Sequence, residues 1–285
     1  MLGWAPLSYA RQLTRRYGDL CTFRLFHNRA FIANSPELVH QVLVVDADAY
    51  QKQRRQMRIL ARVFGQGLLT SDGPLWVRQR GLIQQAFSSD RMADFQRICR
   101  EEVAVCVQNW RPGESVNVSH ELVQVMPAIS GRVFFGNAYS QHGGKLINAV
   151  CDVSTVIIRD IERCVQIPDR PRVLGKSRRR RAMETLRRTV GMIMDDMRAS
   201  QDGLGAMTQV LQQAMRDPQR PLSQRQATDE IVTVLVAGNH TIVASLEWMF
   251  KVVASHADVQ DRVTKELSGR ALDRPAEFQD FADFP

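Results

Sequence analysis

The sequence predicts a mainly α-helical protein that is organised around one long apolar helix, with a small β-hairpin near its N-terminus. Three observations support this fold class. Residues 231–253 place apolar side chains at helical spacing, leave the other faces mostly apolar as well, and contain no proline. Two short segments before residue 34 have the composition and alternation of paired strands. Almost all of the chain beyond residue 35 has the pattern of helices.

Composition places broad limits on the protein. With 285 residues and 44% hydrophobic composition, the chain can bury a large core. This length suits one large domain or two ordinary ones, and we expect a single domain over residues 1–285. The net charge of +8 permits an acidic partner without requiring one.

Cysteine usage and the N-terminus bear on the compartment. There are five cysteines, an odd number without a CxxC pair or a histidine cluster, which argues against a disulfide framework and against a zinc site. The first 18 residues show neither a signal peptide nor a membrane anchor. We therefore expect a cytoplasmic protein without a transmembrane anchor.

The N-terminal elements follow from local signals. Residues 6–17 predict a short helix closed by Gly18. Residues 21–25 and 30–33 predict the two strands of a hairpin. Ser35, Pro36 and Glu37 supply an N-cap, a first-turn proline and a first-turn acid, which open a helix that runs through Leu43.

The middle of the chain predicts further helices. One carries an apolar stripe between residues 92 and 110. The next is expected to be capped by Ser119, kinked at Pro127 and to end near Gly136. Two more are expected over residues 145–165 and 177–198.

The long apolar helix has a polar interruption at its centre. Ser223 and Gln226 can form a capping box that starts the helix one or two turns before the apolar segment. At residues 237–241 the sequence is Ala-Gly-Asn-His-Thr. Gly238 costs about 1 kcal/mol relative to alanine in a helix, and Thr241 can return its hydroxyl to the carbonyl of Ala237. Such a small, polar segment would let a flat ligand approach the backbone.

Two other interpretations fit the apolar pattern of this helix. It could be a transmembrane span, but Asn239, His240 and Glu247 fall within one 20-residue window and argue against one. It could also be a core helix whose glycine serves packing alone. The segment by itself does not decide between packing and function.

A second informative segment is GLLTSDGPLWVRQR, residues 67–80. Gly73 and Pro74 start a helix on which Trp76 and Arg80, four residues apart, share one face. An indole N–H beside a guanidinium group can bind a carboxylate. For an isolated WxxxR pattern, a buried tryptophan beside a solvated arginine is the commoner arrangement.

Taken in order, these two motifs resemble the cytochrome P450 superfamily in its soluble bacterial form. RRYGDL with the hairpin, FFGN, and SLEWMFKVVASHADVQDRVTKEL also resemble family segments, and they occur in the family's order. The resemblance covers essentially the whole chain. It implies a P450 fold and a haem-thiolate monooxygenase, an oxidoreductase that oxidises an apolar small molecule with O2.

The resemblance also implies roles for individual residues. Trp76 and Arg80 would hold a propionate of a b-type haem, and Ala237 and Gly238 would leave room for dioxygen and substrate. Thr241 matches the threonine that delivers protons during oxygen activation. His240 stands where the family usually has an acid; an imidazole can shuttle protons near neutral pH, but a carboxylate relay is then absent.

One family feature is missing from the sequence. The family's haem iron is held by a cysteine in an FxxGxxxCxG loop, and neither that loop nor the preceding ExxR helix occurs here. We therefore expect an incomplete P450 fold, the N-terminal part of the protein, with no iron-ligating residue in residues 1–285 and no monooxygenase activity of this chain alone. A non-catalytic remnant remains the alternative.

The expected partners are a small apolar substrate, O2 and, near Arg78 and Arg91, an acidic redox protein of the ferredoxin or flavodoxin type. The run KSRRRR at residues 176–181 is the strongest positive charge cluster, and a solvated helix start is its commoner interpretation. A basic all-α binding module is the rival functional class. No interleaved aromatic residues or nucleic-acid-binding motif support it, so we expect no nucleic acid partner.

Overall fold

The structure is a computed structural model that describes residues 6–25, 28–162, 176–199 and 203–268. Contacts group the chain into two compact units, residues Met1–Gln53 and Arg54–Pro285. The expected single domain over residues 1–285 stays a prediction. The described chain is mainly helical with one two-stranded sheet, which confirms the predicted fold class.

The first unit contains the predicted hairpin. Helix α1 (Pro6–Tyr17) is followed by strands β1 (Leu20–Leu25) and β2 (Asn28–Ala33), which pair antiparallel in a register from Leu20 opposite Ala33 to Leu25 opposite Asn28. The rings of Tyr9 and Phe23 meet edge to face at 6.2 Å and join α1 to β1. Helix α2 (Pro36–His40) begins as predicted, because the Ser35 hydroxyl accepts the Leu38 N–H, and a π-helical turn extends it to Val45.

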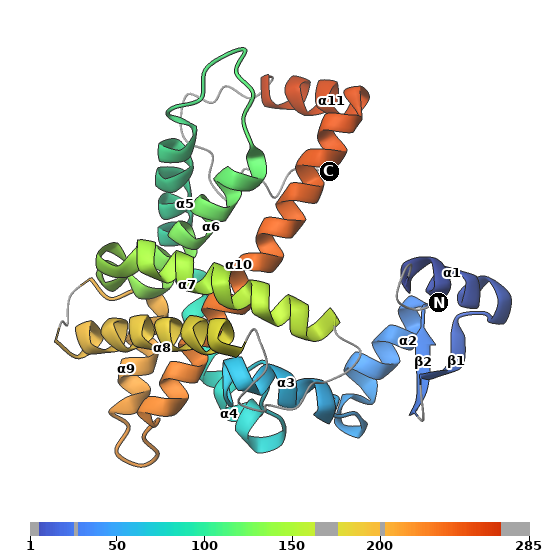
Figure 1. Cartoon of the computed structure of the whole chain (residues 1–285), viewed down its shortest axis with the longest axis horizontal. Coiled ribbons are helices and arrows are strands. Elements are labelled where there is room, and N and C mark those ends of the chain that lie inside the picture. The colour runs from blue at the N-terminus through green and yellow to red at the C-terminus, as the bar shows by residue number, and fades with distance from the viewer. Residues whose placement is uncertain (1–5, 26–27, 163–175, 200–202, 269–285) are drawn as a thin grey trace. The chain divides into compact units, whose positions relative to one another are not determined.

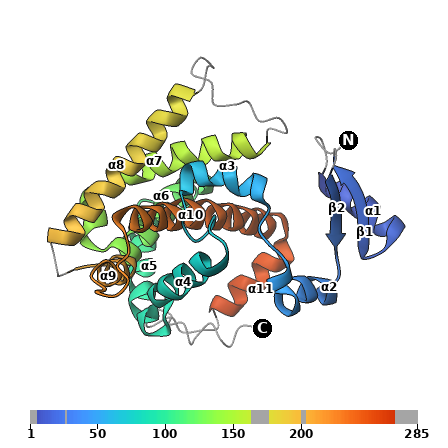
Figure 2. The same cartoon turned by 90° about the horizontal axis from the view of Figure 1, so that it is seen from below.

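The second unit consists of helices, which have the following bounds: α3 (Arg54–Phe64), α4 (Gly73–Gln84), α5 (Met92–Val107), α6 (Val118–Phe135), α7 (Asn137–Glu162), α8 (Lys176–Ala199), α9 (Ala206–Met215), α10 (Gln224–Ser255) and α11 (Ala257–Ser268). Helix α10 crosses the middle of this unit. Helix α8 lies along its N-terminal part, α6 packs against its middle, and its C-terminal part extends toward α11 (Figures 1 and 2).

Two predicted boundaries were wrong. Helix α6 is capped by Asn117, whose side chain accepts the His120 N–H, and not by Ser119, which lies inside the helix. Helix α7 begins at Asn137, eight residues before the predicted start at 145. Gly143 packs against the ring of Tyr139, where an added Cβ would lie 2.8 Å away. Packing therefore outweighs the low helix propensity of glycine there.

Helix α10 is the core element that the sequence predicted. Both halves of its capping box form: the Ser223 hydroxyl accepts the Gln226 N–H at 3.2 Å, and the Gln226 side chain accepts the Ser223 N–H at 3.1 Å. Its fully buried apolar residues include Ala227 and Ile231. They belong to a hydrophobic cluster that also contains residues of α3, α4, α7, α8 and α9.

Burial along α10 is uneven. Its buried residues end at Val243, and large apolar side chains beyond that point are exposed, among them Trp248, Met249 and Phe250. Of the described helices, α10 alone is long and apolar enough to cross a membrane by length and composition, a test that the core helix of a soluble protein also meets. Its packing against α3, α6, α7 and α8 is that of a core helix.

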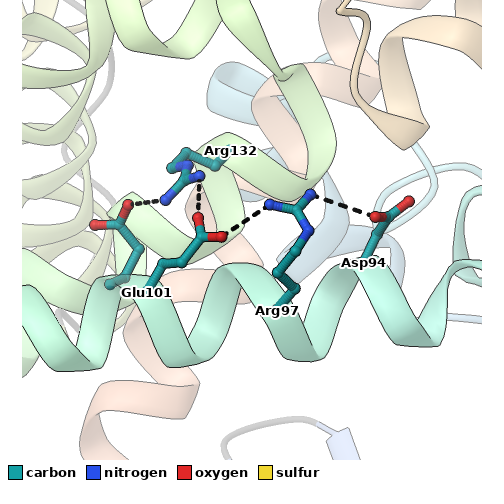
Figure 3. A network of polar contacts seen from close by, with 5 residues as sticks. Asp94, Arg97, Glu101 and Arg132 are labelled. Atoms are coloured by element: carbon teal, nitrogen blue, oxygen red, sulfur yellow. Dashed lines mark hydrogen bonds and ion pairs between the residues drawn. The ribbon is translucent and has the colours of Figure 1, made fainter.

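A network of charged side chains joins α5 to α6 (Figure 3). The guanidinium group of Arg132 donates to Glu101 at 2.6 Å and to Glu102 at 2.5 Å. Glu101 also accepts from Arg97, which in turn donates to Asp94. These side chains are partly to largely solvent-accessible, so the contribution of Arg132 to stability is on the order of 1 kcal/mol.

The structure describes only some side chains of the charge run at the start of α8. The side chains of residues 176–179 are not among them. Arg180 and Arg181 are exposed, and Arg180 pairs with Glu184 one turn later at 3.1 Å. For these two residues the structure agrees with a solvated helix start.

Candidate functional site

Helix α4 presents the predicted tryptophan–arginine pair. The helix begins where the Asp72 side chain accepts the N–H of Gly73 at 3.0 Å, with Gly73 in the left-handed region at a φ of 58°. One turn on, the guanidinium carbon of Arg80 lies 5.0 Å from the ring centroid of Trp76. The i, i+4 spacing thus brings the two side chains together as the sequence indicated.

Arg80 is available to bind an anion. Its side chain is exposed, while Trp76 is half-buried. Among the residues that the structure describes, no carboxylate lies within ion-pair distance of Arg80. A guanidinium group held over an indole ring keeps its N–H donors directed outward for a planar carboxylate.

On α10, the predicted interruption at residues 237–241 has an open side. The Thr241 hydroxyl donates to the carbonyl of Ala237 at 3.0 Å, as predicted from the sequence. Apart from the helix's own backbone, an added Cβ at Gly238 would meet no atom of the described residues within 4 Å. Ala237 and Gly238 are partly exposed and Thr241 is exposed, so a flat group could reach the helix backbone here.

Asn239 belongs to the packed side of α10. It is buried, its amide donates to the carbonyl of Leu235 at 2.7 Å, and its oxygen accepts the Ser130 hydroxyl of α6 at 2.8 Å. The carbonyl of Pro127 accepts the same hydroxyl at 3.3 Å, beside the proline inside α6. Asn239 therefore fastens α10 to α6.

His240 lines a separate small cavity of about 170 Å³ between α6, α7 and α10. Pro127, Asn239 and Cys151 line the same cavity. The His240 ring is exposed. His240 therefore lines a cavity that Gly238 and Thr241 do not line.

The α3–α4 loop (residues 65–72) is bound to α10 by two acidic residues that the sequence analysis missed. The N–H of Gln66 donates to Asp229 and the N–H of Leu68 donates to Glu230, each at 3.0 Å. Asp229 and Glu230 are both buried. The loop leads directly into α4, so it joins the two helices that carry the predicted site residues. We expect Trp76 and Arg80 to face Thr241 across a gap that a haem could fill, and this arrangement stays a prediction.

The environment of Glu230 favours its neutral form. The pKa of this carboxyl is raised from 4.5 to about 7: burial raises it most, the hydrogen bond from the Leu68 N–H lowers it, and the negative charge of Asp229 raises it. The side chain has no exposed surface. Desolvation therefore outweighs the backbone hydrogen bond.

A basic groove opens beside α4. It is a cavity of about 830 Å³ whose lining includes Arg78, Arg216 and Arg220. Arg78 donates to the carbonyl of Arg220 at 2.5 Å, which connects α4 to the loop that follows α9. Arg91, the second arginine predicted to dock a partner, lines a different cavity and donates to Gln209 at 2.9 Å.

Comparisons with known proteins identify relatives over the whole chain. The cytochrome P450 family model matches residues 3–285. Two relatives from Streptomyces melanosporofaciens, cyclooctat-9-en-7-ol 5-monooxygenase and cyclooctatin synthase, are 26% and 28% identical over 96% and 93% of this chain. Pentalenene oxygenase from Streptomyces avermitilis is 22% identical over 96%. The chain spans about 60% of the length of these relatives.

Solved structures show the same fold. Retinoic-acid-bound cyanobacterial CYP120A1 superposes with a TM-score of 0.79 at 18% identity, over 99% of this chain and 63% of its own. CYP175A1 from Thermus thermophillus superposes with a TM-score of 0.68 at 23% identity, over 92% of this chain and 60% of its own. At these identities the likeness establishes the fold and not the activity.

The raised pKa of Glu230 predicts a pH-dependent stability. The folded protein holds the proton of Glu230 more tightly than the unfolded chain does. The stabilisation that this proton gives the folded state is therefore complete below pH 4.5 and is lost as the pH rises through about 7. Between pH 5 and 8 the free energy of unfolding of the unsubstituted protein should fall by on the order of 3 kcal/mol relative to that of Glu230→Gln. Urea denaturation at several pH values measures this difference.

Glu101→Gln is the matched control for that measurement. Hydrogen bonds from Arg132 and then from Arg97 lower the pKa of Glu101, so this carboxyl is ionised throughout the same pH range. Its variant should differ from the unsubstituted protein by a constant amount between pH 5 and 8. Parallel pH profiles for Glu230→Gln and the unsubstituted protein would show that Glu230 is not the titrating group.

Proposed function

The chain belongs to the cytochrome P450 family, and from that premise we propose that it provides the propionate-binding and oxygen-facing part of a haem-dependent monooxygenase. The observation that carries the proposal is the exposed Arg80 guanidinium stacked on Trp76, without an ion pair to any described carboxylate. This favours the oxygenase over the basic binding module that the charge runs suggested.

The described residues fit a haem. Arg80 offers N–H donors that suit a propionate carboxylate, and the indole N–H of Trp76 is a second donor from the same helix face. Among the described residues outside the α10 backbone, no atom lies within 4 Å of a Cβ at Gly238, which gives the flat macrocycle a place of approach on α10. When bound, haem supplies the oxygen activation by which one oxygen atom is inserted into the substrate.

Thr241 is the proposed proton-handling residue. Its hydroxyl donates to the Ala237 carbonyl, which fixes the oxygen's position and leaves its lone pairs to accept a further hydrogen bond. His240 is proposed to relay protons toward it, since an imidazole changes charge near neutral pH. The separate cavity that His240 lines would then be the side from which protons arrive.

The proposed substrate is a small apolar molecule, and O2 is the co-substrate. Two of the relatives have names that specify oxygenation of cyclooctat-9-en-7-ol and of pentalenene, and the -en- and -ene in these names denote carbon–carbon double bonds. We propose a cytoplasmic location, supported by the fact that none of the four described cysteines forms a disulfide.

Electrons are proposed to come from an acidic redox protein, of the ferredoxin or flavodoxin type, that docks on the basic groove. Arg78, Arg216 and Arg220 give the groove a positive lining, and Asp217 is the acidic residue among them. The backbone N–H groups of Gln219 and Arg220 lower the pKa of Asp217, so it remains ionised. Three positive charges against one negative charge attract an acidic surface over about the Debye length.

Haem titration tests the proposed site. Arg80→Leu should weaken haem affinity about tenfold, or about 1.4 kcal/mol, because it removes the charged donors to a propionate. Trp76→Phe should have a smaller effect, because it removes one neutral donor and keeps an aromatic ring. The haem absorbance change on titration into the purified chain reports the affinity.

Arg181→Leu is the control for this titration, because Arg181 is an exposed arginine on α8. It should bind haem as the unsubstituted chain does. If Arg80→Leu and Arg181→Leu bind haem equally well, Arg80 does not hold a propionate. If the unsubstituted chain shows no saturable binding, the proposed function fails for this chain.

Charge reversal tests the docking groove. Arg216→Glu combined with Arg220→Glu should weaken binding of a ferredoxin or a flavodoxin about tenfold at 50 mM salt, and the difference should shrink at 500 mM salt because ions screen the charges. Isothermal titration calorimetry at the two salt concentrations measures it. Arg181→Glu reverses a charge outside the groove, and an equal loss in that variant would contradict a specific docking surface.

A further inference from the structure

We propose that Asp229 and Glu230 are positioning residues that hold helix α4 at a fixed place relative to α10, through the α3–α4 loop. The inference deepens the proposed function, on which it rests, because α4 carries Trp76 and Arg80 while α10 carries Gly238 and Thr241. A haem held by both helices requires that their separation be set before it binds, since preorganisation of a site reduces the cost of binding.

The first observation is that two consecutive residues of α10 bind one loop through its backbone. Asp229 accepts from the N–H of Gln66 and Glu230 accepts from the N–H of Leu68, each at 3.0 Å. The contacts connect residues more than 160 positions apart in the sequence. Because the donors are backbone groups, the acids fix the path of the chain itself and not merely the direction of a side chain.

The second observation is that the loop approaches α10 more closely than residues with side chains would allow. A Cβ at Gly65 would lie 2.1 Å from the Asp229 carboxylate, and Gly65 has a φ of 56° in the left-handed region. A Cβ at Gly67 would lie 2.1 Å from the hydroxyl of Thr233, one turn further along α10. The two glycines permit a contact that the two acids then hold.

The third observation is that α4 is tied to the same loop. Gln79 lies on α4 between Trp76 and Arg80 and is 1% exposed. Its amide donates to the carbonyl of Gln66 at 2.7 Å, so the backbone of Gln66 is held by α10 through its N–H and by α4 through its C=O. The Thr70 hydroxyl donates to the carbonyl of Gly65 at 2.8 Å and closes the loop on itself. No step in this connection depends on a long flexible side chain at the surface.

The connection is also kept at an energetic cost. One carboxylate oxygen of Glu230 and the side-chain oxygen of Gln79 are buried without a hydrogen-bond partner among the described protein groups. Buried acceptors of this kind usually cost stability, and such exceptions concentrate where a structure serves function.

Asp229 lies eight residues before Ala237, about 12 Å along the helix axis at 1.5 Å per residue. The contact therefore positions α4 without occupying the site.

Spin labels test the proposal directly. Val77 on α4 and Ile242 on α10 are 62% and 44% exposed, so both can carry a label without disturbing the core. Labelled non-natural amino acids avoid the native cysteines, of which Cys151 is exposed. Pulsed electron paramagnetic resonance measures the distribution of distances between the two labels. In the double variant Asp229→Ala with Glu230→Ala, this distribution should be at least about twofold broader than in the labelled chain without these two substitutions.

Conservative variants separate positioning from a general loss of stability. Asp229→Asn with Glu230→Gln keeps an oxygen acceptor at each position and should retain the narrow distribution. Arg132→Ala destabilises the contact between α5 and α6 elsewhere in the unit and should also retain it. If the double alanine variant does not fold, Gln79→Leu breaks the connection on the α4 side, leaves α10 intact and should broaden the distribution likewise.

Haem affinity is the second measurement. At a temperature where all variants are folded, the double alanine variant should bind haem about tenfold more weakly, and the Asn/Gln variant should bind it as the unsubstituted chain does. An unchanged distance distribution in both the double alanine and Gln79→Leu variants overturns the positioning role, as does a broadened distribution with unchanged haem affinity. Absence of haem binding by the unsubstituted chain instead counts against the proposed function, and the label distances still decide whether the acids position α4.

Discussion

The structure depends on how α10 satisfies the polar groups that it buries. A helix in the middle of a hydrophobic core can keep a carboxylate or an amide only if each finds a hydrogen-bond partner. Asp229 and Glu230 find theirs in the backbone of the α3–α4 loop, and Asn239 finds its partner in Ser130 of α6. These requirements fix which elements can lie against α10 and at which point along it.

The same helix serves two environments along its length. Up to Val243 its residues contribute to the core, and the packing there stabilises the helix enough to tolerate a glycine that costs about 1 kcal/mol. At Gly238 and Thr241 one side of the helix is open while Asn239 remains buried on the other. A site on a helix held in this way is placed more precisely than one on a free loop.

Much of the fold could be predicted because its signals are local. The capping box of Ser223 and Gln226, the cap at Ser35 and the closing Gly18 each depend on residues within one turn, and all three were predicted. Where two cap-forming residues lie two positions apart, as Asn117 and Ser119 do, local sequence did not indicate the correct one. The predicted start of α7 was wrong, and sequence patterns do not reveal the contact between Gly143 of α7 and the ring of Tyr139.

Local sequence signals predicted part of the candidate site and missed the rest. Trp76 and Arg80 were placed together by helical spacing alone, and the Thr241 hydroxyl bond by the known behaviour of mid-helix threonines. Asp229 and Glu230 were not recognised, because an acidic pair near the start of a helix usually faces water. Their partners lie more than 160 residues earlier in the chain, so only the folded structure could reveal them.

We propose that α4 and α10 together hold a haem. A crystal structure of the chain with haem bound tests it most directly. We expect a propionate oxygen within hydrogen-bond distance of the Arg80 guanidinium and the Trp76 indole, with the macrocycle against Gly238 and Thr241. A haem bound elsewhere, or one whose propionates are held by other residues while Arg80 faces solvent, would contradict it.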